Sequence, residues 1–377
     1  MSARNVPFSK LAETFLSFSP EKFAFSILLC YNGKKCSSFD WKKEGISMAT
    51  LEDIARSLGV SKSTVSKALS GADDVSDAMR TAVLEKAVEL GYTPPARRGS
   101  PKRIALFITN MSCATADDFG YDIMIGFRKM AEPAGFVVDV IQLTTELQQQ
   151  WRYDTYMVTN RYCGGLFLGL SLLDPWIRDF ETCQTPTVLY DNHVRGNPNV
   201  AQVAVDSFEG MHLVVDYLKS QGHKKIGYLS SALQAYVYQQ RYHAFFRAMD
   251  ESGLPGSQSL SGSAYHISDC LTHHLPRLLD EGCTAIVCSH DNLAYSVLLH
   301  CRELGLRVPE DISIVGFDDI PLCRYARPPL TTVRQDRMNL GKSAFSAMSA
   351  LMHGIPLGTI FLRAELIRRG SCAAPKK

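Results

Sequence analysis

The sequence lacks the patterns that would mark an enzyme, a metalloprotein or a membrane protein. Its eleven cysteines include no Cys-x-x-Cys pair, and no cysteine–histidine cluster has the spacing of a zinc site. No run of about 18 apolar residues occurs, so we expect no membrane-spanning segment. The motifs Gly-x-Ser-x-Gly, Gly-x-Gly-x-x-Gly and Gly-x-x-x-x-Gly-Lys-Ser/Thr are also missing. We therefore predict no catalytic residues, no metal and no cofactor, and the scattered cysteines favour a reducing cytoplasm.

The sequence also lacks a large net charge. A formal charge of +2 at pH 7 over 377 residues excludes a strongly basic protein, so any nucleic-acid contact must come from a local patch. Such a patch lies between Pro94 and Arg103, where four cations occur without an acid: Arg97, Arg98, Lys102 and Arg103. The chain is too long for one typical domain, and its 46% apolar content can form a large core, so two or three domains are expected.

Residues 50–71, TLEDIARSLGVSKSTVSKALSG, predict two short helices joined by a tight turn. Thr50 is suited to cap the first helix, Gly59 to end it and Ser61 to cap the second. The outer face of the second helix carries small or cationic side chains, namely Lys62, Ser63, Ser66 and Lys67. Short side chains allow close approach to a DNA major groove, and a lysine reaches phosphates or guanine edges. The alternative is an ordinary helical hairpin within a bundle.

A third helix is predicted for residues 77–90, which makes 48–93 a small all-helical domain. Residues 1–47 do not match the rest of the chain. Their apolar stretch, 23–31, is too short to span a membrane, and no small-residue cleavage site comes after it. We expect 1–47 to be a non-native or disordered extension before a natural start at Met48, with a regulatory arm as the alternative.

From residue 103 onwards, nearly continuous apolar strands alternate with amphipathic helices. This pattern predicts parallel sheets that are covered by helices on both faces. The segment is too long for one compact sheet, so we expect two α/β lobes with a cleft between them. Ligands of such sheets sit beyond the carboxyl ends of the strands. The polar residues expected there are Thr109, Asn110, Asp191, Asn192, His193, His290, Asp291 and Asp318.

Eight motifs in sequence order resemble the lactose/galactose repressor (LacI/GalR) family of bacterial transcription regulators. They lie at 50–71, 75–94, 204–231, 239–249, 289–298, 303–322, 328–344 and 362–372. The resemblance implies a small all-α helix-turn-helix head that binds operator DNA. It also implies a two-lobed α/β core with parallel sheets, like that of periplasmic binding proteins, which holds a small-molecule effector.

The resemblance further implies how the chain is divided. The first lobe comprises 103–206 and 335–360, and the second comprises 207–334 and 361–372, with a tail at 373–377. The chain would cross between the lobes near Asp206, Thr332 and Phe361. Members of the family are homodimers or tetramers whose paired heads read a pseudo-palindromic operator. The C-terminus carries no heptad repeat, which favours a homodimer.

In the head, Lys62, Ser63 and Lys67 fall on the family's base-reading positions. Each has a phosphate contact as its alternative, which would position the head without reading sequence. A base contact is favoured for Ser63 and Lys67, and the two roles are even for Lys62. The other expected DNA contacts, through phosphate bonding or helix capping, are Thr50, Ser61, Thr64 and Ser66.

In the core, Arg241 falls on the arginine that clasps the effector, and Asp318 on the aspartate opposite it. An arginine donates hydrogen bonds and a carboxylate accepts them, which suits a ligand rich in hydroxyls, such as a sugar. An interlobe salt bridge is the alternative. His290 stands where many members have Asn, so a ligand contact and a polar core role are both open. The full expected effector set is Asn110, Asp191, His193, Arg241, Tyr265, His290 and Asp318.

The linker at 94–102 departs from the family pattern. Members usually have an Asn-rich hinge helix whose Leu wedges into the minor groove. Here the segment PPARRGSPKR has neither Asn nor Leu, and its prolines and Gly99 oppose a helix. The linker is either a plain basic tether that touches phosphates or an extended arm that places Arg97 or Arg98 in the minor groove.

The leading hypothesis is a cytoplasmic, ligand-responsive transcriptional regulator, most simply a repressor, that is not an enzyme. Its expected partners are double-stranded operator DNA, a sugar-like effector and a second copy of the chain, with no membrane. The alternative is a small-molecule binding or sensor protein with weak or no specific DNA readout. The helical head at 50–90 favours the regulator.

Overall fold

The protein is represented by a computed structural model, which describes residues 49–72, 74–92, 101–231 and 233–376. The chain divides into two units, Met1–Ser47 and Met48–Lys377. The expectations for 1–47 and for Arg97 and Arg98 concern residues that lie outside the described part of the chain. Among the described residues, no helix has both the length and the apolar character needed to cross a membrane.

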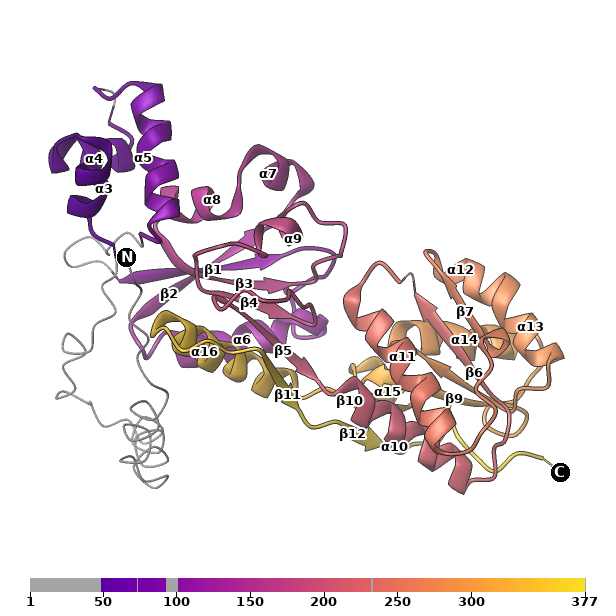
Figure 1. Cartoon of the computed structure of the whole chain (residues 1–377). Helices are drawn as coiled ribbons and strands as arrows, with labels where there is room; N and C mark the ends of the chain where they lie inside the picture. Colours follow the sequence, from indigo (N-terminus) through magenta and orange to yellow (C-terminus); the bar gives the residue numbers. More distant parts are fainter. Residues whose placement is uncertain (1–48, 73, 93–100, 232, 377) are drawn as a thin grey trace, which may run out of the picture. The chain divides into compact units, whose positions relative to one another are not determined.

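The first described residues form three short helices, α3 (Leu51–Leu58), α4 (Lys62–Ser70) and α5 (Asp77–Glu89) (Figure 1). Thr50, Ser61 and Ser76 cap them, since each hydroxyl accepts a hydrogen bond from the backbone N–H three residues later. Gly59 and Gly71 end α3 and α4 with φ of 66° and 75°, a left-handed conformation that suits glycine. The apolar faces of the helices share one core, which includes Ile54, Ala55, Val65, Ala68, Val83, Ala87 and Tyr92.

The first α/β lobe has a six-stranded sheet of order β11-β5-β4-β3-β1-β2, in which every pair is parallel. The strands are β1 (Lys102–Ile108), β2 (Phe136–Gln142), β3 (Tyr162–Leu168), β4 (Thr187–Tyr190), β5 (Val200–Val205) and β11 (Thr359–Leu362). The helices are α6 (Phe119–Ala131), α7 (Thr145–Gln150), α8 (Tyr153–Thr159), α9 (Trp176–Asp179) and α16 (Arg337–Met352). Central strands such as β3 are buried along their whole length because helices cover both faces.

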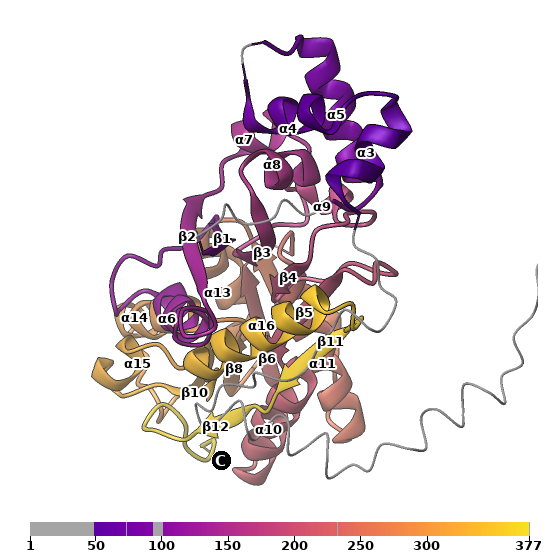
Figure 2. The same ribbon diagram turned by 90° about the vertical axis from the view of Figure 1, so that its left-hand side faces the viewer.

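Helices α6 and α16 lie side by side on one face of this sheet (Figure 2). Two glycines permit their close approach. A Cβ atom added at Gly126 would lie 2.2 Å from the Met338 carbonyl oxygen, and one added at Gly341 would lie 2.0 Å from the Ile123 carbonyl oxygen. The opposite face carries an aromatic core that includes Phe107, Tyr153, Phe167, Trp176 and Phe180.

The second lobe has a sheet of order β12-β10-β9-β8-β6-β7, parallel except for the β10–β12 pair. The strands are β6 (Ile226–Ser231), β7 (Ser261–Ala264), β8 (Ala285–Cys288), β9 (Ser313–Asp318), β10 (Thr331–Arg334) and β12 (Glu365–Ile367). The helices are α10 (Ser207–Ser220), α11 (Tyr236–Glu251), α12 (Ile267–Asp269), α13 (Leu275–Asp280), α14 (Asp291–Glu303) and α15 (Leu322–Tyr325). Cores on both faces confirm the expected fold class of two parallel-sheet lobes with a helical head.

The chain passes between the two sheets after β5, after β10 and after β11. Phe361 belongs to β11 of the first sheet, so the third passage comes after Leu362, slightly later than expected. Helix α11 begins at Tyr236, without a side-chain cap at Ala235. The aromatic and β-branched residues of that first turn have low helix propensity, so the sequence gives no local signal for this start.

Candidate functional site

The outer face of α4 is exposed as expected. Val65 and Ala68 are buried in the core of the head, whereas Lys62, Ser63, Ser66 and Lys67 face solvent. The exposed side chains recur with helical periodicity on the side opposite the buried ones. A surface of short polar side chains flanked by lysines therefore stands clear of the head's own core.

The hydroxyls at the helix starts are used locally. Thr50 and Asp53 form a reciprocal capping box, with Thr50 N donating to Asp53 Oδ2 over 2.9 Å. Ser61 Oγ accepts a 3.0 Å hydrogen bond from Thr64 N and lies 2.9 Å from Thr64 Oγ1. Thr50 and Ser61 are thus helix caps in the free head, and the Thr64 hydroxyl bonds to the Ser61 cap.

Both exposed lysines of α4 have acidic partners. Lys62 Nζ lies 3.6 Å from Glu52 Oε2 on α3, and Lys67 forms an ion pair with Asp74 in the loop after α4. Sequence reasoning missed both acids. The signal for Asp74 was the αL glycine Gly71, which turns the chain back along the end of the helix.

Arg241 on α11 is the centre of a second polar cluster. Its side chain is 3% exposed, and Nη1 lies 3.2 Å from Asp318 Oδ1 and donates to the Ser289 carbonyl oxygen over 2.6 Å. Nη2 lies 3.9 Å from Asp191 Oδ2 of the first lobe, and the guanidinium stacks 3.8 Å above the Phe317 ring. The buried Nε has no acceptor among the described residues. One guanidinium thus joins both lobes and keeps a donor unused.

Three residues at strand ends have an unusual backbone. Asn110 comes after β1, Asp191 comes after β4 and Asp318 ends β9, and their φ values are 52°, 51° and 118°. A positive φ is uncommon for residues other than glycine and is often retained where a side chain must be aimed. All three lie at carboxyl ends of parallel strands, where ligands of such sheets bind.

Carboxylates outnumber the guanidinium in this cluster. Burial raises the pKa of Asp191 to about 6, and the neighbouring charge of Arg241 opposes that rise. Burial also raises the pKa of Asp291, to which the nearby Asp318 carboxylate adds. Asp291 is held by Thr332 Oγ1 at 2.6 Å and by Ile320 N at 3.0 Å, so it serves the second lobe's own structure. A ligand that donates hydrogen bonds would relieve this excess of acceptors.

His290 caps α14. Its Nδ1 accepts a 3.2 Å hydrogen bond from Leu293 N, so Nε2 carries the proton and donates to Ser231 Oγ over 3.1 Å. Burial lowers the pKa of His290, which keeps the ring neutral. A histidine nitrogen thus provides the acceptor that an asparagine oxygen provides at a helix N-cap.

Further contacts between the lobes surround the cluster. The His193 and Tyr236 rings stack with centroids 6.0 Å apart, and Leu172 N donates to the Gln234 carbonyl oxygen over 2.9 Å. The Tyr190 hydroxyl donates to Gln335 Oε1 over 3.0 Å, and Gln335 Nε2 donates to Asp318 Oδ1 over 2.7 Å. Sequence reasoning missed Tyr190, Tyr236 and Gln335, and also Tyr238, whose ring packs edge-on against His290 with 5.4 Å between centroids. Tyr238 could have been found from the sequence, because it lies three residues before Arg241 and therefore on the same helix face.

Two predicted effector residues stand apart. Asn110 is exposed, and its Nδ2 donates to the Gly169 carbonyl oxygen over 3.1 Å. Tyr265 is 76% exposed after β7 and packs edge-on against His266, 5.0 Å between ring centroids. No contact joins Tyr265 to Arg241 among the residues that the structure describes. Within the same residues, no group of three or more His, Cys, Asp or Glu side chains could hold a metal ion.

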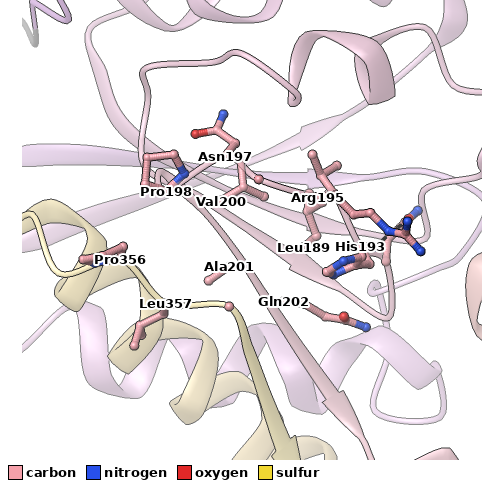
Figure 3. A pocket seen from close by; sticks show the side chains of 14 residues that line it. Leu189, His193, Arg195, Asn197, Pro198, Val200, Ala201, Gln202, Pro356 and Leu357 are labelled. Carbon is pink, nitrogen blue, oxygen red and sulfur yellow. Dashed lines mark hydrogen bonds between the residues drawn. The ribbon is translucent and has the colours of Figure 1, made fainter.

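A cavity of about 350 Å³ lies in the first lobe, between the loop 192–198 and the segment 356–358 (Figure 3). The side chains of Asn192 and Asn197 hold backbone carbonyls of the lobe itself. Gln202, which is 6% exposed, lines both this cavity and a small interlobe pocket that Asp191 and Tyr236 also line. The cavity therefore adjoins the edge of the Arg241 cluster.

Comparison with known proteins finds matches for the head and for much of the two-lobed core. Residues 50–95 match the family described as bacterial regulatory proteins, lacI family, and residues 215–372 match a periplasmic binding protein-like domain. The chain is similar to regulators of the LacI family. It is 29% identical over 342 residues to the HTH-type transcriptional repressor CytR of Escherichia coli (strain K12), covering 88% of this chain and 98% of the relative. It is 28% identical to the repressor PurR of Aliivibrio salmonicida, covering 79% and 90%.

Solved structures have the same architecture. A complex of the transcriptional regulator CelR with cellobiose has a TM-score of 0.62 and 26% identity, over 86% of this chain and 99% of that one. The lac repressor dimer bound to operator and the anti-inducer ONPF has a TM-score of 0.59 and 24% identity, over 87% and 100%. The second likeness supports the fold of this chain.

Proposed function

We propose that this protein is a transcriptional repressor that binds a pseudo-palindromic operator as a homodimer and responds to a small molecule held around Arg241. The observation that carries the proposal is the position of Arg241, which contacts carboxylates of both lobes at the carboxyl ends of their strands. The regulator is not an enzyme. Its place of action is the cytoplasm, where the operator and the effector meet.

On the DNA side, α4 enters the major groove. Lys62, Ser63 and Lys67 face the base edges, and Ser66 with the capping hydroxyls of Ser61 and Thr64 approaches the phosphates. Arg97 and Arg98 of the linker add phosphate or minor-groove contacts. Two heads related by a twofold axis then read two half-sites.

On the effector side, we propose a hydroxyl-rich ligand such as a sugar or a sugar derivative. Arg241 donates to the ligand, while Asp191 and Asp318 accept from its hydroxyls. His193, His290 and Asn110 complete the rim, and Tyr265 would join it only after a movement of the loop after β7. The complex of the related regulator CelR with cellobiose supports this ligand class.

The ligand would act by changing the balance between lobe arrangements. Effector hydroxyls compete with the Arg241–Asp191 contact, which is one of the links between the lobes. A ligand shifts such a balance only by its difference in affinity for the two arrangements. The shift is transmitted through the first lobe to the paired heads.

A second function is favoured by one observation, the internal pairing of both exposed lysines of α4. A head whose lysines remain paired with Glu52 and Asp74 would bind DNA weakly and without sequence preference. The protein would then be a small-molecule sensor with little operator readout.

The test is protection of genomic DNA fragments by the full chain at two salt concentrations, with a Lys62→Ala/Lys67→Ala variant as the control. A protected pseudo-palindrome that persists at the higher salt supports the repressor. Weak protection at both salts, equal in the wild type and the variant, supports the sensor instead. Repeating the footprint with cellobiose or ribose present then asks whether a sugar changes the protection, and an effector that acts equally on Arg241→Ala would contradict the proposed ligand site.

A further inference from the structure

The Lys67–Asp74 ion pair lies at the C-terminal end of the DNA-facing helix. Lys67 is in the last turn of α4, and Asp74 is in the loop that leads to α5. The two side chains are 50% and 57% exposed, so the pair is open to an approaching partner. An exposed pair of this kind contributes little to stability.

The loop that carries Asp74 is fixed on both sides. Ala72 N donates to the Lys67 carbonyl oxygen over 3.1 Å, and Arg80 Nη2 donates to the Ala72 carbonyl oxygen over 3.0 Å. Val75, the next residue, is 8% exposed in the core of the head. The carboxylate is therefore held beside the lysine by backbone hydrogen bonds and by a buried neighbour. A donor and an acceptor thus stand side by side at the end of α4.

A G·C base pair presents the complement of this arrangement in the major groove. Guanine offers two acceptors, N7 and O6, and the adjacent cytosine offers a donor, the N4 amino group. Lysine donates to the guanine acceptors, and a carboxylate accepts from cytosine N4. An A·T pair presents its donor between two acceptors, so a lysine placed beside a carboxylate would reach one acceptor instead of two.

We propose that Lys67 and Asp74 read one G·C base pair together in each operator half-site. Lys67 donates to O6 and N7 of the guanine, and Asp74 accepts from N4 of the paired cytosine. The inference rests on the proposed operator binding and assigns to that binding a base preference and a residue, Asp74, that the sequence did not indicate. The carboxylate also fixes the strand on which the guanine must lie.

Because the head is already acidic, the Asp74 carboxylate weakens its binding to DNA sequences that lack the G·C pair. Residues 50–92 contain five Lys and Arg against seven Asp and Glu, a formal charge of −2. Phosphate contacts dominate sequence-independent binding, so an added acid on the binding face weakens binding to every sequence. At a site where Asp74 accepts a hydrogen bond from cytosine, that bond offsets the loss of affinity. Asp74 therefore increases the ratio of specific to non-specific affinity.

The experiment selects preferred sequences from a randomised DNA library with full-length wild type, Asp74→Ala, Lys67→Ala and the double variant. Glu85→Gln is the control, because it removes one exposed acid of the same head outside the Lys67–Asp74 pair. We expect the wild type to prefer G·C at one pair of symmetry-related positions by roughly tenfold or more, the discrimination of a good base contact. Asp74→Ala and Lys67→Ala each lose preference at that pair of positions, the double variant loses little more, and Glu85→Gln keeps it.

Three outcomes overturn the proposal. The first is that Asp74→Ala retains every wild-type preference, and the second is that it binds all sequences more tightly by one common factor. The third is that the two single variants lose preference at different positions. In each case the wild type still selects an operator, so the proposed repressor function survives. If the wild type selects no sequence, operator binding itself is contradicted. Failure of the proposed repressor function is thereby distinguished from failure of the Lys67–Asp74 proposal alone.

Discussion

The guanidinium of Arg241 lies 3.9 Å from the carboxylate of Asp191, although the two residues belong to different lobes. Asp318 of the second lobe lies 3.2 Å from the same guanidinium. Because the group is buried and its Nε has no acceptor among the described residues, a ligand entering here can replace an existing contact and also use a free donor. Ligand binding and the contact between the lobes are therefore linked through one side chain.

Replacing Arg241 should separate DNA binding from the effector response. Arg241→Ala leaves two acidic side chains without their cation, and breaking a buried ion pair costs about 3–5 kcal/mol of unfolding free energy. Arg241→Lys retains the charge but loses the planar fork, so we expect folded protein that binds operator without responding to effector. Operator titrations with and without effector, together with urea unfolding, measure both quantities. Arg247→Ala on the same helix is the exposed control, and an unaltered effector response in Arg241→Lys would contradict the role.

Ionisation of Asp191 should lower the stability of the protein as pH rises between about 4 and 6. In the unfolded chain this carboxyl loses its proton near 3.8, whereas burial raises its pKa to about 6 in the folded protein. Between these values the folded state binds more protons than the unfolded state, so raising the pH favours unfolding by up to about 1.4 kcal/mol per pH unit. Urea unfolding at several pH values should show this slope in wild type and in the exposed control Asp250→Asn. Asp191→Asn should reduce it, and an equal slope in that variant would contradict the assignment.

His290 should be replaceable by asparagine but not by alanine. Asparagine can accept the hydrogen bond from Leu293 N at the start of α14, whereas alanine cannot. We expect His290→Ala to lower the unfolding free energy by about 1 kcal/mol and His290→Asn to lower it by a few tenths. Thermal unfolding distinguishes them. Equal losses in both variants would show that the histidine ring, rather than its capping nitrogen, matters to the fold.

The linker arginines should contribute to the salt dependence of DNA binding. Each phosphate contact adds about 0.9 to the slope of log affinity against log salt, so the double variant Arg97→Ala/Arg98→Ala should flatten the slope by up to about 1.8. Titration of an operator fragment across salt concentrations gives the slope, with Arg128→Ala, an arginine of α6, as a control of equal chemistry. A slope unaltered in the double variant would exclude DNA contact by this segment.

Local features of the head were predictable from sequence because they depend on neighbouring residues. Thr50, Gly59 and Ser61 cap or end helices through contacts within a few positions, and the structure has them in those roles. Asp74 was harder to predict, since Gly71 signals that the chain turns after α4 but not that Asp74 then meets Lys67. Prediction from sequence is therefore limited to contacts between residues a few positions apart.

The Arg241 cluster was predictable in part, and for a different reason. Resemblance to a family indicated Arg241, Asp191 and Asp318, and the structure brings them together. The same reasoning included Tyr265, which lies exposed beside His266, because an aromatic residue after a strand has no local signal for the direction in which it points. It omitted Gln335, whose contact with Tyr190 joins residues 145 positions apart.

The passage of the chain between the sheets has a consequence for synthesis on the ribosome. The first sheet receives its edge strand β11 and its covering helix α16 from residues 337–362, after nearly all of the second lobe has been made. Until those residues emerge, Phe127 and its neighbours lack Phe345, the ring that packs 5.6 Å away. Domains generally fold in the order of their translation, but the lobe that begins first here cannot be completed first. A nascent chain of this protein must therefore hold an unfinished apolar surface in its first lobe until translation is almost over.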